Sequence, residues 1–280
     1  MHVLTFVTSQ PNADFDLWIK KSYPNIEIQD RKILDAGKAV DWFIDTAVDK
    51  SILDNIRTEF KVDIFQQNVE HRMKKLFMAD MDSTIVSGET LDDMAKLAGT
   101  GDKISAITAR AMRGELDFEQ ALRERVGMLK DLPTTIIDQA IDDMELNSGA
   151  QQLLSYLKSK NIHCVLISGG FTQFTSAVAD QLGFDQNFGN QLIVENNCLT
   201  GKVGIPILDK NFKAAKLKEI SKDMQLHPYE SITIGDGAND LDMLQNAGMG
   251  IGYYPKPLLQ DALINRIEYT DLSSLIYAIE

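Results

Sequence analysis

Two aspartates follow a short apolar run in the stretch LFMADMDST, where Asp80 and Asp82 come directly after residues 76–79. An apolar run of this length, bounded by polar residues, predicts a buried strand. Side chains on an extended segment alternate between faces, so the two carboxylates are expected to point the same way. Such a pair can bind an oxygen-ligated cation, and one carboxylate can attack phosphorus while the other transfers a proton.

Two more predicted strands end in polar residues. Ser168 and Gly169 follow HCVLI, and Asp236 follows SITIG in the stretch GDGAND, which also holds Asn239 and Asp240. Each motif alone is more often a turn or a helix cap than a site. However, ligands of open parallel sheets bind outside the carboxyl ends of the strands, so these side chains are expected to converge there. Carboxylates without histidine or cysteine partners favour Mg²⁺.

Strands and helices alternate along the chain after residue 76, which predicts an α/β fold with a doubly wound (Rossmann-like) parallel sheet. The predicted strands cover 76–79, 163–167, 231–235 and 249–253, and the helices lie near 171–182, 213–224 and 239–246. Segment 88–146 has helical periodicity without strand signals, which predicts a helical cap inserted after the first strand. Residues 191–196 and 199–204 favour a hairpin.

Residues 1–67 show a βαββαβ order of short elements, which predicts a small N-terminal α+β domain of the ferredoxin type. A polar connector, 68–75, links it to the core, 76–280. The N-terminal domain could bind a regulatory ligand, as small amino-acid-binding (ACT-like) domains do, or serve only dimerisation or stability. The second alternative is preferred because fold analogy alone does not establish a site. A homodimer is therefore one expected assembly.

The composition is that of an ordinary soluble protein, with 280 residues, 44% hydrophobic residues and a formal charge of −13 from 28 basic and 41 acidic residues. This charge argues against a nucleic-acid partner. No apolar stretch approaches a membrane span, and the first residues do not resemble a signal peptide, so a cytoplasmic location is expected. Cys164 and Cys198 are expected to be free thiols.

The motifs DMDST, SGG and GDGAND, with a lysine before the last, resemble those of the haloacid dehalogenase-like (HAD) hydrolases. The longer stretches ADMDSTIVSGETLDD, FEQALRERVGMLKDLP and TIGDGANDLDML are similar to the phosphoserine phosphatase branch of that family, over about residues 76–255. The resemblance implies a Mg²⁺-dependent enzyme that hydrolyses a small-molecule substrate, O-phosphoserine, through an aspartyl-phosphate. Another small phosphate ester, or a sensor that binds without catalysis, are the alternatives.

The resemblance also implies roles for the strand-end residues. Asp80 would be the nucleophile, and Asp82 the acid that protonates the leaving oxygen and then the base that activates water. Asp236 would complete the Mg²⁺ ligands with the Asp80 carboxylate and the Asp82 backbone carbonyl. Asn239 and Asp240 would orient these ligands.

The remaining implied roles concern the phosphate and the rest of the substrate. Ser168 and Gly169 would hold phosphate oxygens together with Lys213, for which Lys216 is a rival one helical turn away. In the cap, Glu89 would bind the substrate's ammonium and Arg125 its carboxylate. Met112 and Phe118 would close apolar surface over the site. Without the resemblance, Arg125 and Glu89 would be ordinary solvated helix residues, and Met112 and Phe118 could equally belong to the core.

Overall fold

The computed structural model describes residues 1–12 and 14–279, except for the side chain of Met112. One large sheet runs through it in the order β2-β3-β1-β4-β12-β11-β10-β5-β6-β7. Its strands are β1 (His2–Thr8), β2 (Asp30–Asp35), β3 (Ala39–Ile44), β4 (Val62–Asn68), β5 (Leu76–Ala79), β6 (His163–Phe171), β7 (Gln186–Asn190), β10 (Ser231–Gly235), β11 (Met249–Tyr253) and β12 (Arg266–Ile267). A separate hairpin joins β8 (Leu192–Glu195) to β9 (Cys198–Val203), as predicted.

The helices fall into three groups along the chain. The N-terminal part contains α1 (Phe15–Ser22) and α2 (Lys50–Phe60), and the cap contains α3 (Thr90–Leu97), α4 (Gly101–Met112), α5 (Phe118–Gly127) and α6 (Thr135–Asp142). The core contains α7 (Ala150–Ser159), α8 (Thr172–Leu182), α9 (Lys210–Asp223), α10 (Leu241–Asn246), α11 (Pro257–Ala262) and α12 (Leu275–Ile279). None of the helices in this described part is both long and apolar enough to cross a bilayer.

Strand β5 lies at the centre of the core, paired in parallel with β10 on one side and β6 on the other. Its four apolar side chains are fully buried and alternate between the two faces of the sheet. Phe77 and Ala79 join the apolar cluster that includes α7 and α8, whereas Leu76 and Met78 join the cluster that includes α9, α10 and α11. Helices therefore cover both faces, and the predicted doubly wound core is confirmed.

Two strands of this sheet were not predicted. The edge strand β7 pairs in parallel with β6, but its sequence, QNFGN, has no apolar run. Strand β12 has only two residues and pairs in parallel with β11. Both strands form because the neighbouring strand offers free backbone groups, which is a tertiary effect that the local sequence does not report.

The N-terminal part is antiparallel, with the strand order β2-β3-β1-β4 and with α1 and α2 as the connecting helices. This is the predicted ferredoxin-like arrangement. Strand β4 also pairs antiparallel with β12, at Ile64 and Arg266, so the two parts share one continuous sheet. Arg266 reaches across this junction to Asp54 of α2 (2.6 Å), and Arg57 donates to the Ile264 carbonyl (2.9 Å). The domain boundary at 68–75 stays a prediction.

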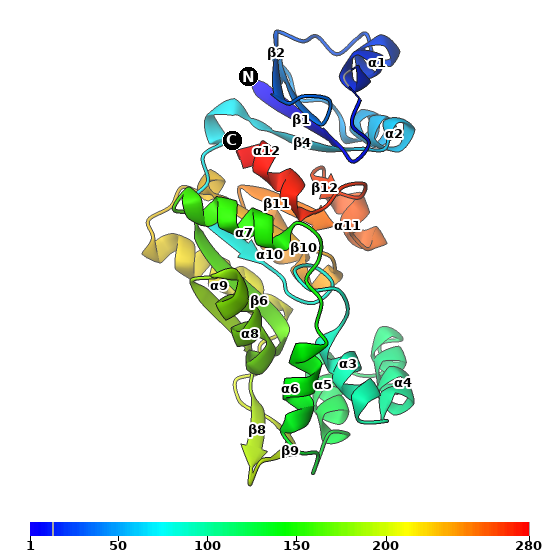
Figure 1. Ribbon diagram of the computed structural model, residues 1–280, viewed down its shortest axis with the longest axis vertical. Coiled ribbons are helices and arrows are strands. Elements are labelled where there is room, and N and C mark those ends of the chain that lie inside the picture. Colours follow the sequence, from blue (N-terminus) through cyan, green and yellow to red (C-terminus); the bar gives the residue numbers. More distant parts are fainter. Residues whose placement is uncertain (13, 280) are drawn as a thin grey trace.

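Figure 1 shows the N-terminal part at one end of the molecule and the cap helices α3–α6, with the β8–β9 hairpin, at the other. The cap follows β5 and returns to the core before β6, as the sequence predicts. Helix α5 begins with a capping box, in which Asp117 accepts from the Gln120 N–H and Gln120 accepts from the Asp117 N–H. The hairpin supports the segment after α5, since the Asp131 N–H donates to the Leu199 carbonyl (2.8 Å).

Candidate active site

The loop after β5 places Asp80 and Asp82 at the carboxyl edge of the sheet. The Asp80 N–H donates to the Ile234 carbonyl (3.0 Å), which continues the pairing of β5 with β10. The chain then turns tightly, because the N–H groups of residues 84, 85 and 86 all lie within 3.2 Å of the Met81 carbonyl. Ser83 adopts φ +56°, in the left-handed region. This turn leaves Asp80 nearly fully buried and Asp82 half-buried.

Lys213, in the first turn of α9, joins two buried carboxylates. Its Nζ lies 2.5 Å from Asp80 Oδ1 and 2.6 Å from Asp240 Oδ1, while Asp240 Oδ2 accepts from the Gly237 N–H (3.1 Å). Burial alone would lower the pKa of Lys213, but Asp240 and Asp80 outweigh it and raise that pKa. Burial and the charge of Asp240 raise the pKa of Asp80, which Lys213 opposes. The ammonium therefore stays charged and holds the two carboxylates together.

The rival lysine lies elsewhere. Lys216 Nζ contacts both oxygens of Glu219 at 2.8 Å. It also lies over the rings of Phe188 and Phe212, 4.8 and 5.3 Å from their centroids. Of the two lysines, only Lys213 is placed at Asp80.

Both oxygens of Asp82 are held by hydrogen-bond donors. The Ser168 hydroxyl, within the last residues of β6 (His163–Phe171), donates to Asp82 Oδ2 (2.7 Å) and accepts from the Gly170 N–H (2.7 Å). The Thr90 N–H, at the start of α3, donates to Asp82 Oδ1 (2.8 Å). A Cβ on Gly170 would lie 3.0 Å from Ser168 Oγ and 3.1 Å from Asp82 Oδ2, so glycine permits this close approach.

Thr90 and Gly170 were missed by the sequence analysis. The signal for Thr90 was its place at the start of a helix that follows the two aspartates, since the first N–H groups of a helix are free to donate. Gly170 was part of the SGG motif, but the need for a glycine beside Ser168 and Asp82 depends on how close β5 and β6 lie.

Asp236 directly follows β10 and completes a triad of carboxylates. Oxygens of Asp80, Asp236 and Asp240 lie within 4.8 Å of one another, and all three residues are buried. Burial raises the pKa of Asp236, while Lys256, whose Nζ lies 2.8 Å from Asp236 Oδ2, opposes the shift. Asn239 lines the cavity described below, and its Nδ2 lies 3.4 Å from Asp240 Oδ1. Asp80, Asp236 and Asp240, which the sequence analysis placed at this edge of the sheet, therefore do lie together, and their binding of a metal stays a prediction.

Lys256 was also missed. It follows β11, whose carboxyl end was predicted to lie at the same edge of the sheet as those of the other strands. That placement was the available signal, because a polar residue shortly after any of these strands can reach the site.

A cavity of about 410 Å³ lies between this edge of the sheet and the cap. It is lined by Asp80, Asp82, Glu89, Thr90, Leu91, Thr108, Phe118, Leu122, Arg125, Ser168, Gly169, Gly170, Phe171, Asp236, Asn239 and Lys256. The Phe118 ring covers the backbone of Gly169, where a Cβ would lie 3.5 Å from the ring. Phe118 is 41% exposed, so it is a cavity wall rather than a core residue. The predicted role of Met112 lies outside the described side chains.

The cap contributes one residue of each charge to the cavity. Glu89 lines the cavity but is exposed to solvent on one side, and its carboxylate accepts from the Ser83 hydroxyl (3.2 Å). The surrounding protein and the charge of Asp82 raise the pKa of Glu89 to about 7, although Lys256 opposes this. Arg125 is half-buried, and burial lowers its pKa while the charges of Asp92 and Glu89 oppose the shift.

The neighbouring arginine of α5 differs. Arg123 pairs with Glu119 (2.7 Å) one helical turn away, and both side chains are about half exposed. Arg125 is therefore the arginine that faces the cavity, and Arg123 belongs to the solvated face of the helix.

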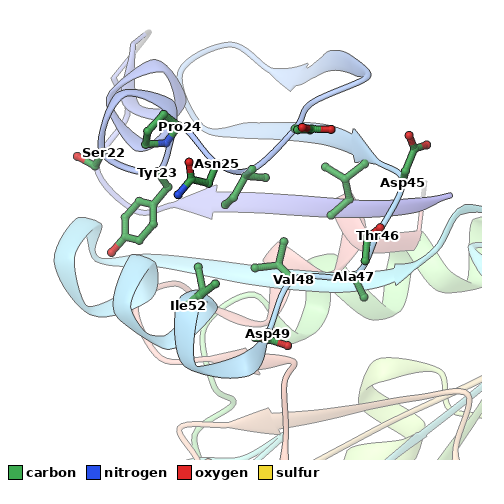
Figure 2. A pocket seen from close by; sticks show the side chains of 13 residues that line it. Ser22, Tyr23, Pro24, Asn25, Asp45, Thr46, Ala47, Val48, Asp49 and Ile52 are labelled. Carbon is green, nitrogen blue, oxygen red and sulfur yellow. The ribbon is translucent and has the colours of Figure 1, made fainter.

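A second cavity, of about 550 Å³, lies in the N-terminal part (Figure 2). The loops after α1 and after β3 form its walls, with Tyr23 and Val48 among the apolar side chains and Asp45 and Asp49 among the acidic ones. No Lys or Arg occurs among the described residues that line it. This cavity is larger than the one at the sheet edge, but it lacks the cations that a phosphate requires.

The two cysteines take no part in either cavity. Cys164 is buried in β6 and Cys198 lies in β9, both as free thiols. Burial raises the pKa of Cys164 to about 12, so its thiol is unreactive at neutral pH.

Comparison with known proteins agrees with this geometry. A phosphoserine phosphatase of Archaeoglobus fulgidus is 40% identical over 205 residues, which are 73% of this chain and 60% of that relative, so the match leaves part of that protein uncovered. A phosphoserine phosphatase of Lactococcus lactis is 42% identical over 203 residues, which are 72% of this chain and 94% of that relative.

A solved structure resembles the whole chain. The crystal structure of a HAD family hydrolase from Salmonella enterica serovar Typhi has a TM-score of 0.90 and 28% identity, and the match covers 100% of this chain and 98% of that one. The family model described as haloacid dehalogenase-like hydrolase matches residues 77–245, more than half of the chain. These residues include both aspartates after β5, Lys213 and the carboxylates after β10. The chain therefore belongs to the haloacid dehalogenase-like hydrolase family.

Proposed function

We propose that the protein is a Mg²⁺-dependent phosphomonoesterase that hydrolyses O-phospho-L-serine to L-serine and phosphate, the last step of serine biosynthesis. The observation that carries the proposal is one cavity in which Asp80, Asp82 and Ser168 on the sheet side face Glu89 and Arg125 on the cap side, with Lys213 bound to Asp80 beneath it. The phosphoserine phosphatases among the relatives support the choice of substrate.

The carboxylate triad fits a magnesium ion. It offers only oxygen ligands within 4.8 Å of one another, which is the donor type that Mg²⁺ prefers. Asp80 and Asp236 would hold the ion together with the Asp82 backbone carbonyl. Asp240 is already bound by Lys213 and by the Gly237 N–H, so it would orient the other ligands. When bound, Mg²⁺ offsets the negative charge of the phosphate and of the carboxylates around it.

In the first half of the reaction, the Asp80 carboxylate attacks phosphorus to form an aspartyl-phosphate, and the bond between phosphorus and the serine oxygen breaks. Asp82 gives its proton to that oxygen, so serine leaves as the neutral alcohol. When the substrate binds, the single Ser168 hydroxyl proton turns from Asp82 Oδ2 to a phosphate oxygen, the Gly169 backbone holds another, and Lys213 stabilises their charge. Because Thr90 and Ser168 fix both oxygens of Asp82, its carboxyl group is already aimed before the substrate arrives.

In the second half, Asp82 accepts a proton from water, which attacks the phosphorus of the aspartyl-phosphate. The bond between phosphorus and the Asp80 oxygen breaks, so phosphate leaves and the Asp80 carboxylate is restored. Asp82 ends with the proton that it donated at the start, and the cycle closes.

Selection of phosphoserine is assigned to the cap. Glu89 pairs with the substrate's ammonium, and the planar guanidinium of Arg125 pairs with its carboxylate. Phe118 covers the cavity during the first half and limits the access of water. An ester that lacks the amino-acid part would gain nothing from Glu89 or Arg125.

The test is inorganic phosphate release from O-phospho-L-serine with Mg²⁺, with EDTA, and with the Asp80→Asn variant. Phosphothreonine, phosphohomoserine and p-nitrophenyl phosphate are assayed alongside. Turnover of phosphoserine that requires Mg²⁺ and is lost in Asp80→Asn supports the proposal. Turnover of the other esters alone would keep the chemistry and refute the substrate. Tight binding without turnover in folded protein would instead identify a sensor.

A further inference from the structure

Lys256 lies at the active-site cavity without a role in the reaction described above. Its N–H donates to the Asp236 carbonyl (2.9 Å), and its ammonium lies 2.8 Å from Asp236 Oδ2. The side chain is nevertheless 59% exposed. The backbone of Lys256 is thus fixed beside Asp236, whereas its long side chain has room to turn within the cavity.

The cavity needs such a cation, because its described lining is mostly negative. The ionisable groups that line it are the carboxylates of Asp80, Asp82, Glu89 and Asp236 and the cations of Arg125 and Lys256. Lys213 lies beneath, fully buried, and its ammonium is already bound by two carboxylates. A phosphate ester that enters the cavity therefore meets more anions than cations.

Asp236 cannot bind a divalent ion and the Lys256 ammonium equally well at the same time. It belongs to the carboxylate triad that fits a divalent ion, and it is also the partner of the Lys256 ammonium. Two positive charges on one carboxylate repel each other strongly at such separations. A divalent ion bound to Asp236 therefore weakens the ion pair between Asp236 and Lys256. The anionic oxygens of a substrate in the same cavity are then the best available partner for the ammonium, since Glu89 is assigned to the substrate's own ammonium.

We propose that Lys256 is a shared cation, which neutralises Asp236 in the metal-free protein and turns to an anionic oxygen of the substrate once a divalent ion holds Asp236. Lys256 would thus be a further substrate-binding residue. The second half of this inference rests on the proposed function, whereas the first half concerns only the divalent ion and this chain.

The first test is calorimetric titration of the full chain with Mg²⁺ alone. Removal of the competing ammonium in Lys256→Met is expected to tighten Mg²⁺ binding roughly 3- to 10-fold, the size of a partly exposed ion pair. Lys222→Met, which removes the same charge from the exposed last turn of α9, is expected to change it by less than about twofold. Unchanged or weaker Mg²⁺ binding by Lys256→Met would overturn the first half.

The second test is binding of inorganic phosphate at saturating Mg²⁺. Lys256→Met is expected to bind phosphate roughly 3- to 10-fold more weakly, while Lys256→Arg, which keeps the charge, stays near the wild type. Equal phosphate affinity in Lys256→Met and the wild type would overturn the second half. If both binding results hold but phosphoserine is not hydrolysed, the proposed substrate fails and the role of Lys256 stands.

Discussion

The replacement of Lys213 by methionine tests the centre of the site most directly. The Lys213 side chain is 3% exposed and its ammonium contacts two carboxylates that are 5% and 0% exposed. Methionine keeps most of the apolar stem but leaves Asp80 and Asp240 buried together without their counter-ion. Loss of one partner from a buried ion pair costs about 3–5 kcal/mol. That is a large part of the roughly 5–15 kcal/mol that stabilises a typical domain.

The assay is urea denaturation of the metal-free protein at pH 7, with Lys216→Met as the matched control. Lys216 pairs with Glu219, whose side chain is 57% exposed, and lies over the Phe188 and Phe212 rings, so its loss is expected to cost about 1–2 kcal/mol, less than that of Lys213. A cost below about 1 kcal/mol for Lys213→Met, or equal costs for the two variants, would refute the reasoning.

Acid supplies a second check on the same variant. A carboxyl group whose pKa is raised by burial destabilises the folded state above that pKa, and the destabilisation fades as the pH falls from the raised pKa to the ordinary one. The deficit of Lys213→Met relative to the wild type is therefore expected to shrink as the pH falls from 7 towards about 4, the ordinary pKa of a carboxyl group. A deficit that grows over this range would show that the lost stability does not come from the paired carboxylates.

Three further predictions concern the cap. Because Glu89 has a pKa of about 7 and binds the substrate's ammonium only when ionised, kcat/KM for phosphoserine should fall as the pH drops through 7. This fall in kcat/KM should be absent in Glu89→Gln, and it should be absent in both proteins when p-nitrophenyl phosphate is the substrate. Identical pH profiles for the two proteins would contradict this. Arg125→Met should raise KM for phosphoserine roughly 10- to 100-fold, the value of a charged hydrogen bond, and Arg123→Met by less than about threefold. Phe118→Ala should lower kcat/KM for every ester roughly tenfold. It should change the unfolding free energy by less than about 1 kcal/mol, because Phe118 is a partly exposed residue of the cavity wall. A loss of stability above about 2 kcal/mol with full activity would instead make Phe118 a core residue.

Much of the site was predictable because its main residues follow apolar strands. The runs LFMA, HCVLI and SITIG are each followed by a polar residue, and a parallel sheet brings these positions to one edge. Asp80, Ser168 and Asp236 were found in this way. The choice between Lys213 and Lys216 needed the structure, since one helical turn separates them and only the packing of α9 decides which one points inward.

The parts that were missed depend on contacts between distant segments. Thr90 and Gly170 reach Asp82 only because the cap and β6 lie close to the first loop. Strands β7 and β12 lack the apolar pattern of a strand and exist by pairing with a neighbour. Lys256 carries no motif, and its contact with Asp236 follows from the position of β11.

The junction of β4 with β12 has a consequence for folding in a crowded solution. Backbone groups at the edge of a sheet attract strands from other chains, which is a common route to aggregation. Here the N-terminal part occupies that edge and also places Asp54 against Arg266, whose side chain is only 6% exposed. A chain that began at β5 would present the bare edge of β12 and leave that guanidinium without this carboxylate. The N-terminal part therefore covers the backbone edge of β12 and supplies the carboxylate that pairs with Arg266.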